Sequence, residues 1–338
     1  MNPPLAAVAP CPIEQVTVES FLRPGEERTL AEDVLDGLTR PFKELPPKHF
    51  YDTHGAELFD QICELPEYYP TRAERSILVR HAAQIAQLTG AGEVVELGSG
   101  TAEKTRVLLS ALEAAGTLSR YVPVDVTEAM VVRCADELTE LFDGLHVHGI
   151  VGDFERHLGH VPRAEESPRI VAFLGGTIGN FSPGARRRFL RQIAGLLRPG
   201  IDYLLLGTDL VKAPSVLEAA YDDSAGVTAA FNRNVLRVIN RELGADFDVD
   251  AFEHVAFFDR EHEWIEMRLR ATRKMSVSIP AVGLQIEFAA REEIRTEISA
   301  KFTEQRLRDD LGAAGLELAK VLTDEDGRFA LSLSTPAG

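Results

Sequence analysis

The sequence has few cysteines, no long apolar run and no excess of positive charge. Its three cysteines, Cys11, Cys63 and Cys134, are odd in number and widely spaced. Neither a disulfide framework nor a cysteine-type zinc site is therefore expected. Acidic residues outnumber basic ones by 53 to 36, which gives a net charge of −17. Because that charge repels phosphate groups, nucleic acid and anionic membranes are not expected partners.

No segment approaches the roughly 20 apolar residues that a membrane-spanning helix needs. The most apolar stretch, IVAFLGGTIGNF, is short and broken by glycines. The beginning, MNPPLAAVAPCPIEQ, has no lysine or arginine before its short apolar piece, unlike a secretory signal. We therefore expect a cytoplasmic protein without an obligatory protein partner. Its 338 residues, 45% of them hydrophobic, suffice for one large domain or two ordinary ones.

Strands and helices are predicted to alternate between residues 74 and 208. The expected strands are 93–97, 121–126, 145–151, 169–174 and 202–208. Helices fill the intervals, with Thr127 as one expected N-cap and Ser182, followed by Pro183, as another. Such alternation is typical of a parallel, doubly wound sheet, which binds ligands beyond the carboxyl ends of its strands.

The pattern changes after residue 210. Residues 215–243 are predicted to be helical, and IEMRLRATR (265–273) alternates like a half-buried antiparallel strand. A helix that begins after Thr303 and a hairpin through DEDG would complete the first sheet. The fold class is therefore α/β, a Rossmann-like sheet with an inserted α+β domain. We expect a mobile segment at 1–20, the inserted domain at 21–72 and 211–301, and the sheet domain at 73–210 and 302–338.

The loop after the first predicted strand, ELGSGTAE (96–103), narrows the choice of cofactor. A dinucleotide fingerprint would place a third glycine at position 103, where this chain has Glu103. A carboxylate at a helix N-terminus also competes with phosphate for the same N–H groups. No GK[ST] follows, so a P-loop is excluded as well. What remains is a glycine turn at Gly98 and Gly100 that admits a ligand without phosphates.

Acidic residues stand at the ends of the next two predicted strands. Asp125 lies 27 residues after Gly98, as suits the two hydroxyls of a ribose. Asp153 is placed to accept from an adenine amine, with Phe154 against the ring. The glycine turn, Asp125, and Asp153 with Phe154 follow one another in this order along the chain. Together they indicate an S-adenosylmethionine (SAM) site. The simpler alternative is an ordinary tight turn between a strand and a helix.

Several long blocks resemble the L-histidine Nα-methyltransferases of ergothioneine biosynthesis. The blocks are FYDTHGAELFDQICELPEYYPTRAE (50–74), VELGSGTAEKT (95–105), FLGGTIGNF (173–181), LLLGTDLVK (204–212) and AYDDSAGVTAAFNRNVLRVINRELGADFD (220–248). The resemblance covers roughly residues 40–338. It implies a SAM-dependent enzyme that methylates the α-amine of L-histidine three times to give hercynine. It also implies that the sheet domain binds SAM, that the inserted domain binds substrate, and that histidine lies between them.

The resemblance also implies roles for individual residues. Those carried over to the cofactor are Tyr68, Gly98, Lys104, Asp125, Asp153 and Phe154. Those carried over to histidine are Tyr51, Tyr68, Asn180, Tyr221, Met267, Glu297 and Ser299, with Tyr51 and Asn180 catalytic. The imidazole would meet the Glu and Ser, and the amine and carboxylate would meet the Asn and tyrosines. Two positions differ from the common form of the family: His49 stands where Trp is common, and Gly176 precedes Thr177 where Ser is frequent. Neither is a principal ligand, so the expected activity is unchanged.

These residue types suit methyl transfer to an amine. The reaction needs a neutral amine, and an amino acid's amine is mostly protonated at neutral pH, so positioning is the main task. The Asn180 amide is both donor and acceptor, and tyrosine rings stabilise a nitrogen that gains charge. Glu297 and Ser299 are two residues apart, so on a strand they share a face. A carboxylate and a hydroxyl there suit the two ring nitrogens of imidazole.

Without the resemblance, simpler interpretations of the same residues are open. Glu297 and Ser299 would be a solvated strand face, Met267 core, Asn180 a turn residue and Lys104 a solvated helix charge. Two functional alternatives also remain, a different acceptor such as a tryptophan-derived amine, and a non-enzymatic protein that retains the cofactor fold. Histidine pairs at 146/148 and 157/160 lack a convincing third ligand, so no metal is predicted.

Overall fold

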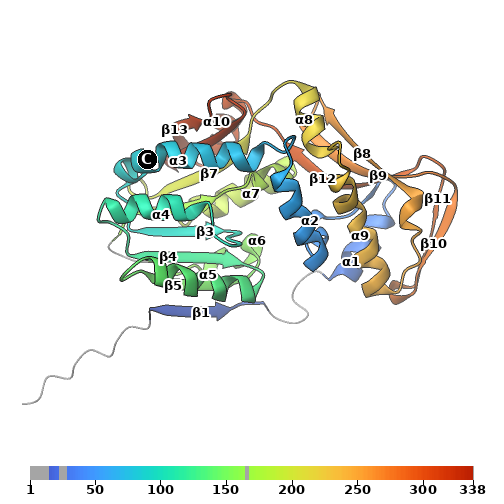
Figure 1. Ribbon diagram of the computed structural model, residues 1–338, viewed down its shortest axis with the longest axis horizontal. Helices are drawn as coiled ribbons and strands as arrows, with labels where there is room; N and C mark the ends of the chain where they lie inside the picture. The colour runs from blue at the N-terminus through green and yellow to red at the C-terminus, as the bar shows by residue number, and fades with distance from the viewer. Residues whose placement is uncertain (1–14, 23–28, 164–166, 338) are drawn as a thin grey trace, which may run out of the picture.

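The computed structural model describes residues 15–22, 29–163 and 167–337. Two sheets organise the chain, and Figure 1 shows them side by side, the larger on the left. The larger sheet runs in the order β1 (Val16–Ser20), β5 (His146–Val151), β4 (Arg120–Asp125), β3 (Glu93–Leu97), β6 (Arg169–Phe173), β7 (Tyr203–Asp209), β14 (Phe329–Pro336), β13 (Leu316–Thr323). Its first six strands are parallel, and β14 and β13 are antiparallel. The five expected parallel strands and the closing hairpin are confirmed.

Strand β1 corrects the expected mobile segment at 1–20. Residues 16–20 pair with β5 in parallel, and the N–H of Phe21 donates to the carbonyl of Val151 at 2.9 Å. Gly149 of β5 admits this strand, because a Cβ there would lie 2.4 Å from Val131 and 3.3 Å from Val18. The rest of the expected segment, residues 1–14, lies outside the described residues.

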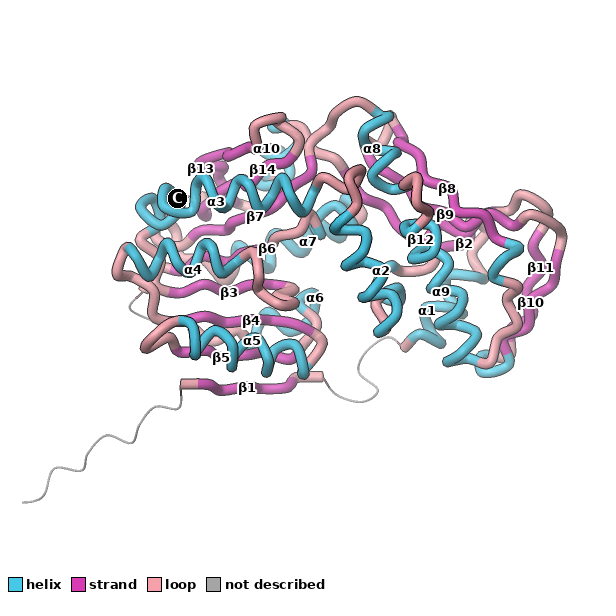
Figure 2. Tube along the Cα trace, viewed as in Figure 1, coloured by secondary structure: helices cyan, strands magenta, loops and turns pink. Residues whose placement is uncertain are grey.

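Helices cover both faces of the larger sheet (Figures 1 and 2). One hydrophobic core joins the sheet to α3 (Pro70–Thr89), α4 (Thr105–Ala114) and α5 (Glu128–Leu141), and a second joins it to α7 (Pro183–Ala194) and α10 (Glu304–Gly312). Ser182 and Thr303 cap their helices as expected. Thr127 stands at the N-cap of α5, but its side chain makes no capping bond.

Residues 30–64 and 214–300 build the smaller part. Its sheet runs in the order β2 (Lys43–Glu44), β12 (Glu293–Ala300), β9 (Trp264–Ala271), β8 (Phe252–Asp259), and its hairpin is β10 (Met275–Ile279) with β11 (Leu284–Phe288). Its helices are α1 (Leu30–Leu38), α2 (Thr53–Glu64), α8 (Pro214–Tyr221) and α9 (Val227–Leu243). The region expected to be helical at 215–243 is thus two helices, and the antiparallel strand expected at 265–273 is β9.

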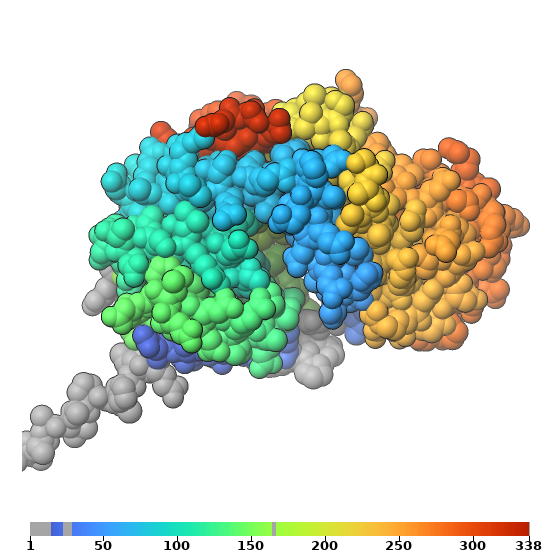
Figure 3. Space-filling view, in the orientation of Figure 1, coloured from blue at the N-terminus to red at the C-terminus, as the bar shows by residue number. Residues whose placement is uncertain are grey.

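The two parts meet at the carboxyl ends of the parallel strands. Strand β3 lies between β4 and β6, so the strand order reverses there. The chain continues after β3 to α4 on one face of the sheet and after β6 to α7 on the other, and doubly wound sheets bind ligands at such a point. The chain leaves the large sheet after Asp209 and returns beside it, since the N–H of Phe302 donates to the Asp209 carbonyl at 2.8 Å. The surface is hollowed between α2 and the large sheet (Figure 3). In the part of the chain that the structure describes, no helix is long and apolar enough to cross a membrane.

Candidate active site

The loop after β3 is shaped by two left-handed glycines. Gly98 has φ +72° and Gly100 has φ +48°, a conformation that favours glycine. The N–H of Gly98 donates to the Val124 carbonyl at 2.8 Å, which holds the loop against β4. A Cβ on Gly98 would lie 3.6 Å from the Phe154 ring. The structure therefore brings Gly98 and Phe154 together, as the cofactor prediction requires.

Two carboxylates border this loop. Asp125 ends β4 and accepts from the N–H groups of Gly100 and Thr127, both at 3.0 Å. Asp153 is the N-cap of α6 (Phe154–His157) and accepts from the Glu155 N–H at 2.8 Å. These bonds fix both carboxylates and use only part of their accepting capacity. The arrangement leaves two oriented acceptors beside an aromatic ring, which fits a nucleoside without phosphates.

The Lys104 side chain is largely buried, which excludes the alternative of a solvated charge on a helix. It forms an ion pair with Glu74 of α3, whose side chain is fully buried. Glu74 also accepts from the Gly175 N–H at 2.8 Å, so it ties α3 to the loops after β3 and β6. Glu74 is not among the site residues predicted from the sequence. One signal in the sequence could have identified it. Glu74 lies three residues before Ile77 and four before Leu78, so this charged residue shares the face of α3 that packs into the core.

Glu297, Ser299 and Met267 lie on the smaller sheet where it faces the larger one. Glu297 of β12 pairs in register with Met267 of β9. Glu297 and Ser299 are only 9% and 5% exposed, which excludes the solvated strand face. Burial raises the pKa of Glu297 to about 7, against the opposing charge of Lys301. This carboxyl group is therefore poised to change its charge with its surroundings.

Three tyrosines adjoin these residues. The Tyr221 hydroxyl donates to Ser299 Oγ at 2.8 Å, and its ring meets the Tyr68 ring edge-on at 6.4 Å. Tyr51 packs edge-on against Phe59 and Phe231 and is half exposed. Although half of the side chain is exposed, the protein packed around the Tyr51 hydroxyl raises its pKa, and the neighbouring Glu297 raises this pKa further. The hydroxyl of Tyr51 is therefore protonated throughout the neutral range.

Asn180 reaches the site from the larger sheet. It ends the 3₁₀ helix η3 (Thr177–Asn180), which packs against β12. Gly179 permits this contact, because a Cβ there would lie 2.9 Å from the Ala300 carbonyl oxygen. Asn180 and Glu297 line one cavity of about 490 Å³. One predicted substrate residue of each part thus lines this cavity. The other five, Tyr51, Tyr68, Tyr221, Met267 and Ser299, are not among its lining residues.

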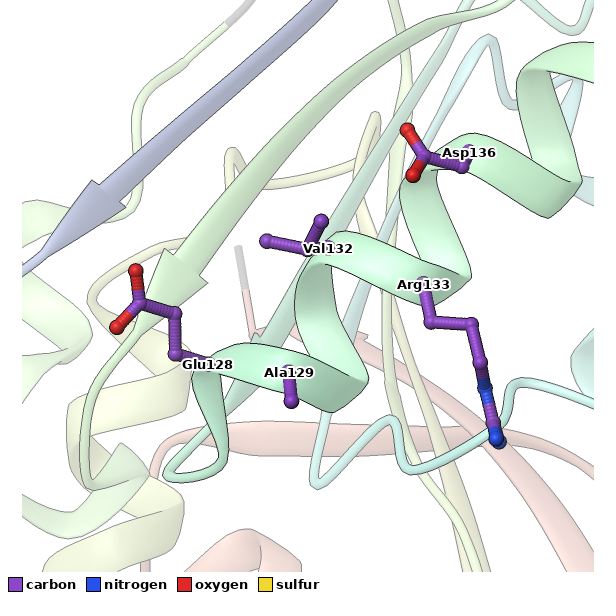
Figure 4. Close-up of a pocket in the computed structure, with 5 residues that line it drawn as sticks. All are labelled: Glu128, Ala129, Val132, Arg133 and Asp136. Atoms are coloured by element: carbon purple, nitrogen blue, oxygen red, sulfur yellow. The ribbon is translucent and has the colours of Figure 1, made fainter.

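A second hollow lies on α5 and is not a comparable site. It is lined by Glu128, Ala129, Val132, Arg133 and Asp136, all from this one helix. Figure 4 shows their side chains spread along the helix and pointing in different directions. Among the described residues, no group of three or more histidine, cysteine, aspartate or glutamate side chains is placed to hold a metal ion.

Comparison with known proteins decides the family. Residues 30–336 match the model of the family described as "Histidine-specific methyltransferase, SAM-dependent". The chain belongs to the histidine-specific, SAM-dependent methyltransferase family. Histidine N-alpha-methyltransferases of Mycobacterium tuberculosis and Mycolicibacterium smegmatis are 53% and 51% identical, each over 90% of this chain and 94% of theirs. Ergothioneine biosynthesis protein 1 of Schizosaccharomyces pombe is 33% identical over 78% of this chain and 35% of that protein.

Membership of the histidine-specific, SAM-dependent methyltransferase family agrees with the cofactor features of the large sheet. The methyl donor of the family is SAM, as the loop without phosphate-binding features predicted. The family match covers both parts of the chain, so the cavity between Asn180 and Glu297 lies within the matched region.

Proposed function

We propose that the protein transfers methyl groups from SAM to the α-amino group of L-histidine three times, giving hercynine in the first step of ergothioneine biosynthesis. The observation that carries the proposal is the buried pair Glu297 and Ser299 on one strand, beside Asn180, in a chain of the histidine-specific family. A different acceptor such as a tryptophan-derived amine is disfavoured, because an indole ring gains little from a buried carboxylate at its edge.

The large sheet would bind the donor. Gly98 allows close approach, Asp125 accepts from the ribose hydroxyls, and Asp153 with Phe154 holds the adenine. Lys104 and Tyr68 complete this side of the site, Lys104 from its ion pair with Glu74. Bound SAM supplies an electrophilic methyl group on a sulfonium.

The smaller part would bind histidine by its ring. Glu297 accepts the N–H of the imidazole, Ser299 meets the other ring nitrogen, and Met267 packs against the ring. These groups are buried, so an analogue without the matching ring nitrogens leaves them unpaired. Loss of such pairing is costly, which gives the site its selectivity.

The amine and carboxylate of histidine would be bound by four residues, Asn180, Tyr51, Tyr68 and Tyr221. The Asn180 amide holds the carboxylate and the amine together, because it has both a donor and an acceptor. The oxygen of the Tyr51 hydroxyl accepts an N–H of the amine in the first two transfers and so aims the lone pair. Before each of the three transfers one proton leaves the ammonium to water. The tyrosine ring faces stabilise the growing positive charge by ~0.5–2 kcal/mol each.

The proposal includes a cytoplasmic location and no requirement for nucleic acid, membrane or a protein partner. Two features support it. The net charge of −17 disfavours polyanions, and both proposed substrates are small molecules.

Incubation of the protein with methyl-labelled SAM and each of the twenty amino acids tests the function. We expect histidine alone to be methylated, with product mass showing three added methyl groups at completion. Glycine and free tryptophan serve as controls for nonspecific amine methylation. A panel in which another amino acid is methylated faster than histidine, or none at all, would contradict the proposal.

A further inference from the structure

Lys301 is a buried cation that directly contacts Ser299 and Tyr221, two of the proposed histidine-binding residues. It follows β12 and its side chain is 0% exposed. The ammonium lies 2.9 Å from Asp209 Oδ2, 3.0 Å from the Tyr221 hydroxyl and 2.9 Å from Ser299 Oγ. An ammonium has three N–H groups and no lone pair. All three are therefore donated, and the oxygens of Tyr221 and Ser299 must both accept from Lys301.

The two hydroxyl groups are also bonded to each other. Tyr221 Oη lies 2.8 Å from Ser299 Oγ, with the tyrosine as donor. A phenol is more acidic than an alcohol, which favours the same direction. Ser299 Oγ then accepts from both Tyr221 and Lys301, and its two lone pairs are used. The hydrogen of the Ser299 hydroxyl remains, so Ser299 has only a donor to offer a ligand.

On the proposed function, we infer that Lys301 is a positioning residue that fixes Ser299 as a hydrogen-bond donor, so that the pocket selects a neutral imidazole tautomer. The ring nitrogen that faces Ser299 must carry a lone pair, and the nitrogen that faces the Glu297 carboxylate must carry the hydrogen. An imidazolium ring, or the other tautomer, places an N–H against an oxygen that has no lone pair left. Such a mismatch leaves buried polar groups unpaired.

Asp209 keeps Lys301 in place. This carboxylate ends β7 and accepts from Tyr69 at 2.8 and 2.9 Å and from Lys212 at 2.6 Å. Lys212 therefore shares the same carboxylate, and its ammonium also donates to the Tyr69 hydroxyl at 2.7 Å. Among the described residues its ammonium bonds to Tyr69, Asp209 and the Leu210 carbonyl, and not to Tyr221 or Ser299. Lys212 is thus a matched control, because its removal perturbs the same buried cluster without touching the hydroxyl pair directly.

The test uses ring analogues that differ only in one lone pair. Thiazol-4-ylalanine is compared with thien-3-ylalanine, and thiazol-5-ylalanine with thien-2-ylalanine. In each pair the sulfur occupies the same position, and a ring nitrogen replaces a C–H. Dissociation constants are measured by calorimetry on the whole protein with S-adenosylhomocysteine present. The thiazole-to-thiophene affinity ratio then reports the bond donated by Ser299.

In the wild type we expect one of the two thiazoles to bind about tenfold tighter than its thiophene. Ser299→Ala should bring that ratio close to one. Lys301→Met leaves Ser299 free to donate its hydrogen to Tyr221 instead of the ligand, so the ratio should fall severalfold, whereas Lys212→Met should keep it. Lys301→Gln is made alongside, because an amide refills the buried position and yet accepts as well as donates. Thermal unfolding separates loss of folding from loss of the ratio.

A wild-type ratio that persists in folded Lys301→Met and Lys301→Gln but disappears in Ser299→Ala would overturn the role of Lys301 alone. A wild type without a preference for either thiazole would overturn it too, since Ser299 would then not be an enforced donor. Failure of the proposed function gives a different result, namely no methylation of histidine by the wild type.

Discussion

Replacing Glu297 with alanine is expected to lower kcat/KM for histidine about 10³-fold while leaving the Kd for SAM within about twofold. The substitution removes the acceptor of the imidazole N–H, and a buried ring N–H without a partner is strongly disfavoured. The cofactor features lie on the other sheet, so donor binding should not change. Steady-state kinetics with histidine and calorimetry with SAM measure the two effects.

Glu287→Ala is the matched control for this variant. Glu287 is an exposed glutamate of β11, on the same part of the chain, and its removal should leave both quantities unchanged. If Glu297→Ala turned over histidine at the wild-type rate, the proposed ring anchor would be wrong. Equal losses of histidine turnover and cofactor affinity would instead indicate a general structural defect.

Tyr51→Phe is expected to lower kcat about 10²-fold with a small change in KM for histidine. Phenylalanine keeps the ring that packs against Phe59 and Phe231, so the substitution removes only the hydroxyl. The amine then loses the oxygen that aims its lone pair, and a misplacement of about 1 Å suffices for an effect of this size. Rates are measured across neutral and alkaline pH at saturating SAM and histidine.

Tyr203→Phe provides the comparison, because Tyr203 is the first residue of β7, at the amino ends of the parallel strands and away from the site at their carboxyl ends. It should retain wild-type rates. A Tyr51→Phe rate equal to the wild type at every pH would remove Tyr51 from the catalytic group and leave positioning to Asn180.

The parallel sheet was predictable because its strands are short, continuous apolar runs separated by capped helices. Strand β1 was not, because only two of its five residues, Val16 and Val18, are apolar, and it pairs only at the edge of the sheet. The order of the strands could not be obtained from periodicity either, since β3 is flanked by strands that follow it at different distances along the chain.

For the site, strand-end position brought Gly98, Asp125 and Phe154 together, and this followed from the parallel topology. The residues proposed to bind the substrate histidine were predicted from the family resemblance, because spacing alone favoured a solvated strand face for Glu297. The supporting charges were missed for a physical reason. Glu74 and Lys301 are buried by contacts between segments 30 or more residues apart in sequence, as in the Glu74 pair with Lys104 and the Lys301 pair with Asp209.

A crystal structure of the protein with S-adenosylhomocysteine and histidine together tests the central claim most directly. The account predicts the ribose on Asp125, the adenine beside Phe154, and the imidazole within hydrogen-bonding distance of Glu297 and Ser299. The α-amine should then face the sulfur across the cleft, near Tyr51 and Asn180. Histidine bound away from β12, or an imidazole turned from Glu297 toward solvent, would contradict the account.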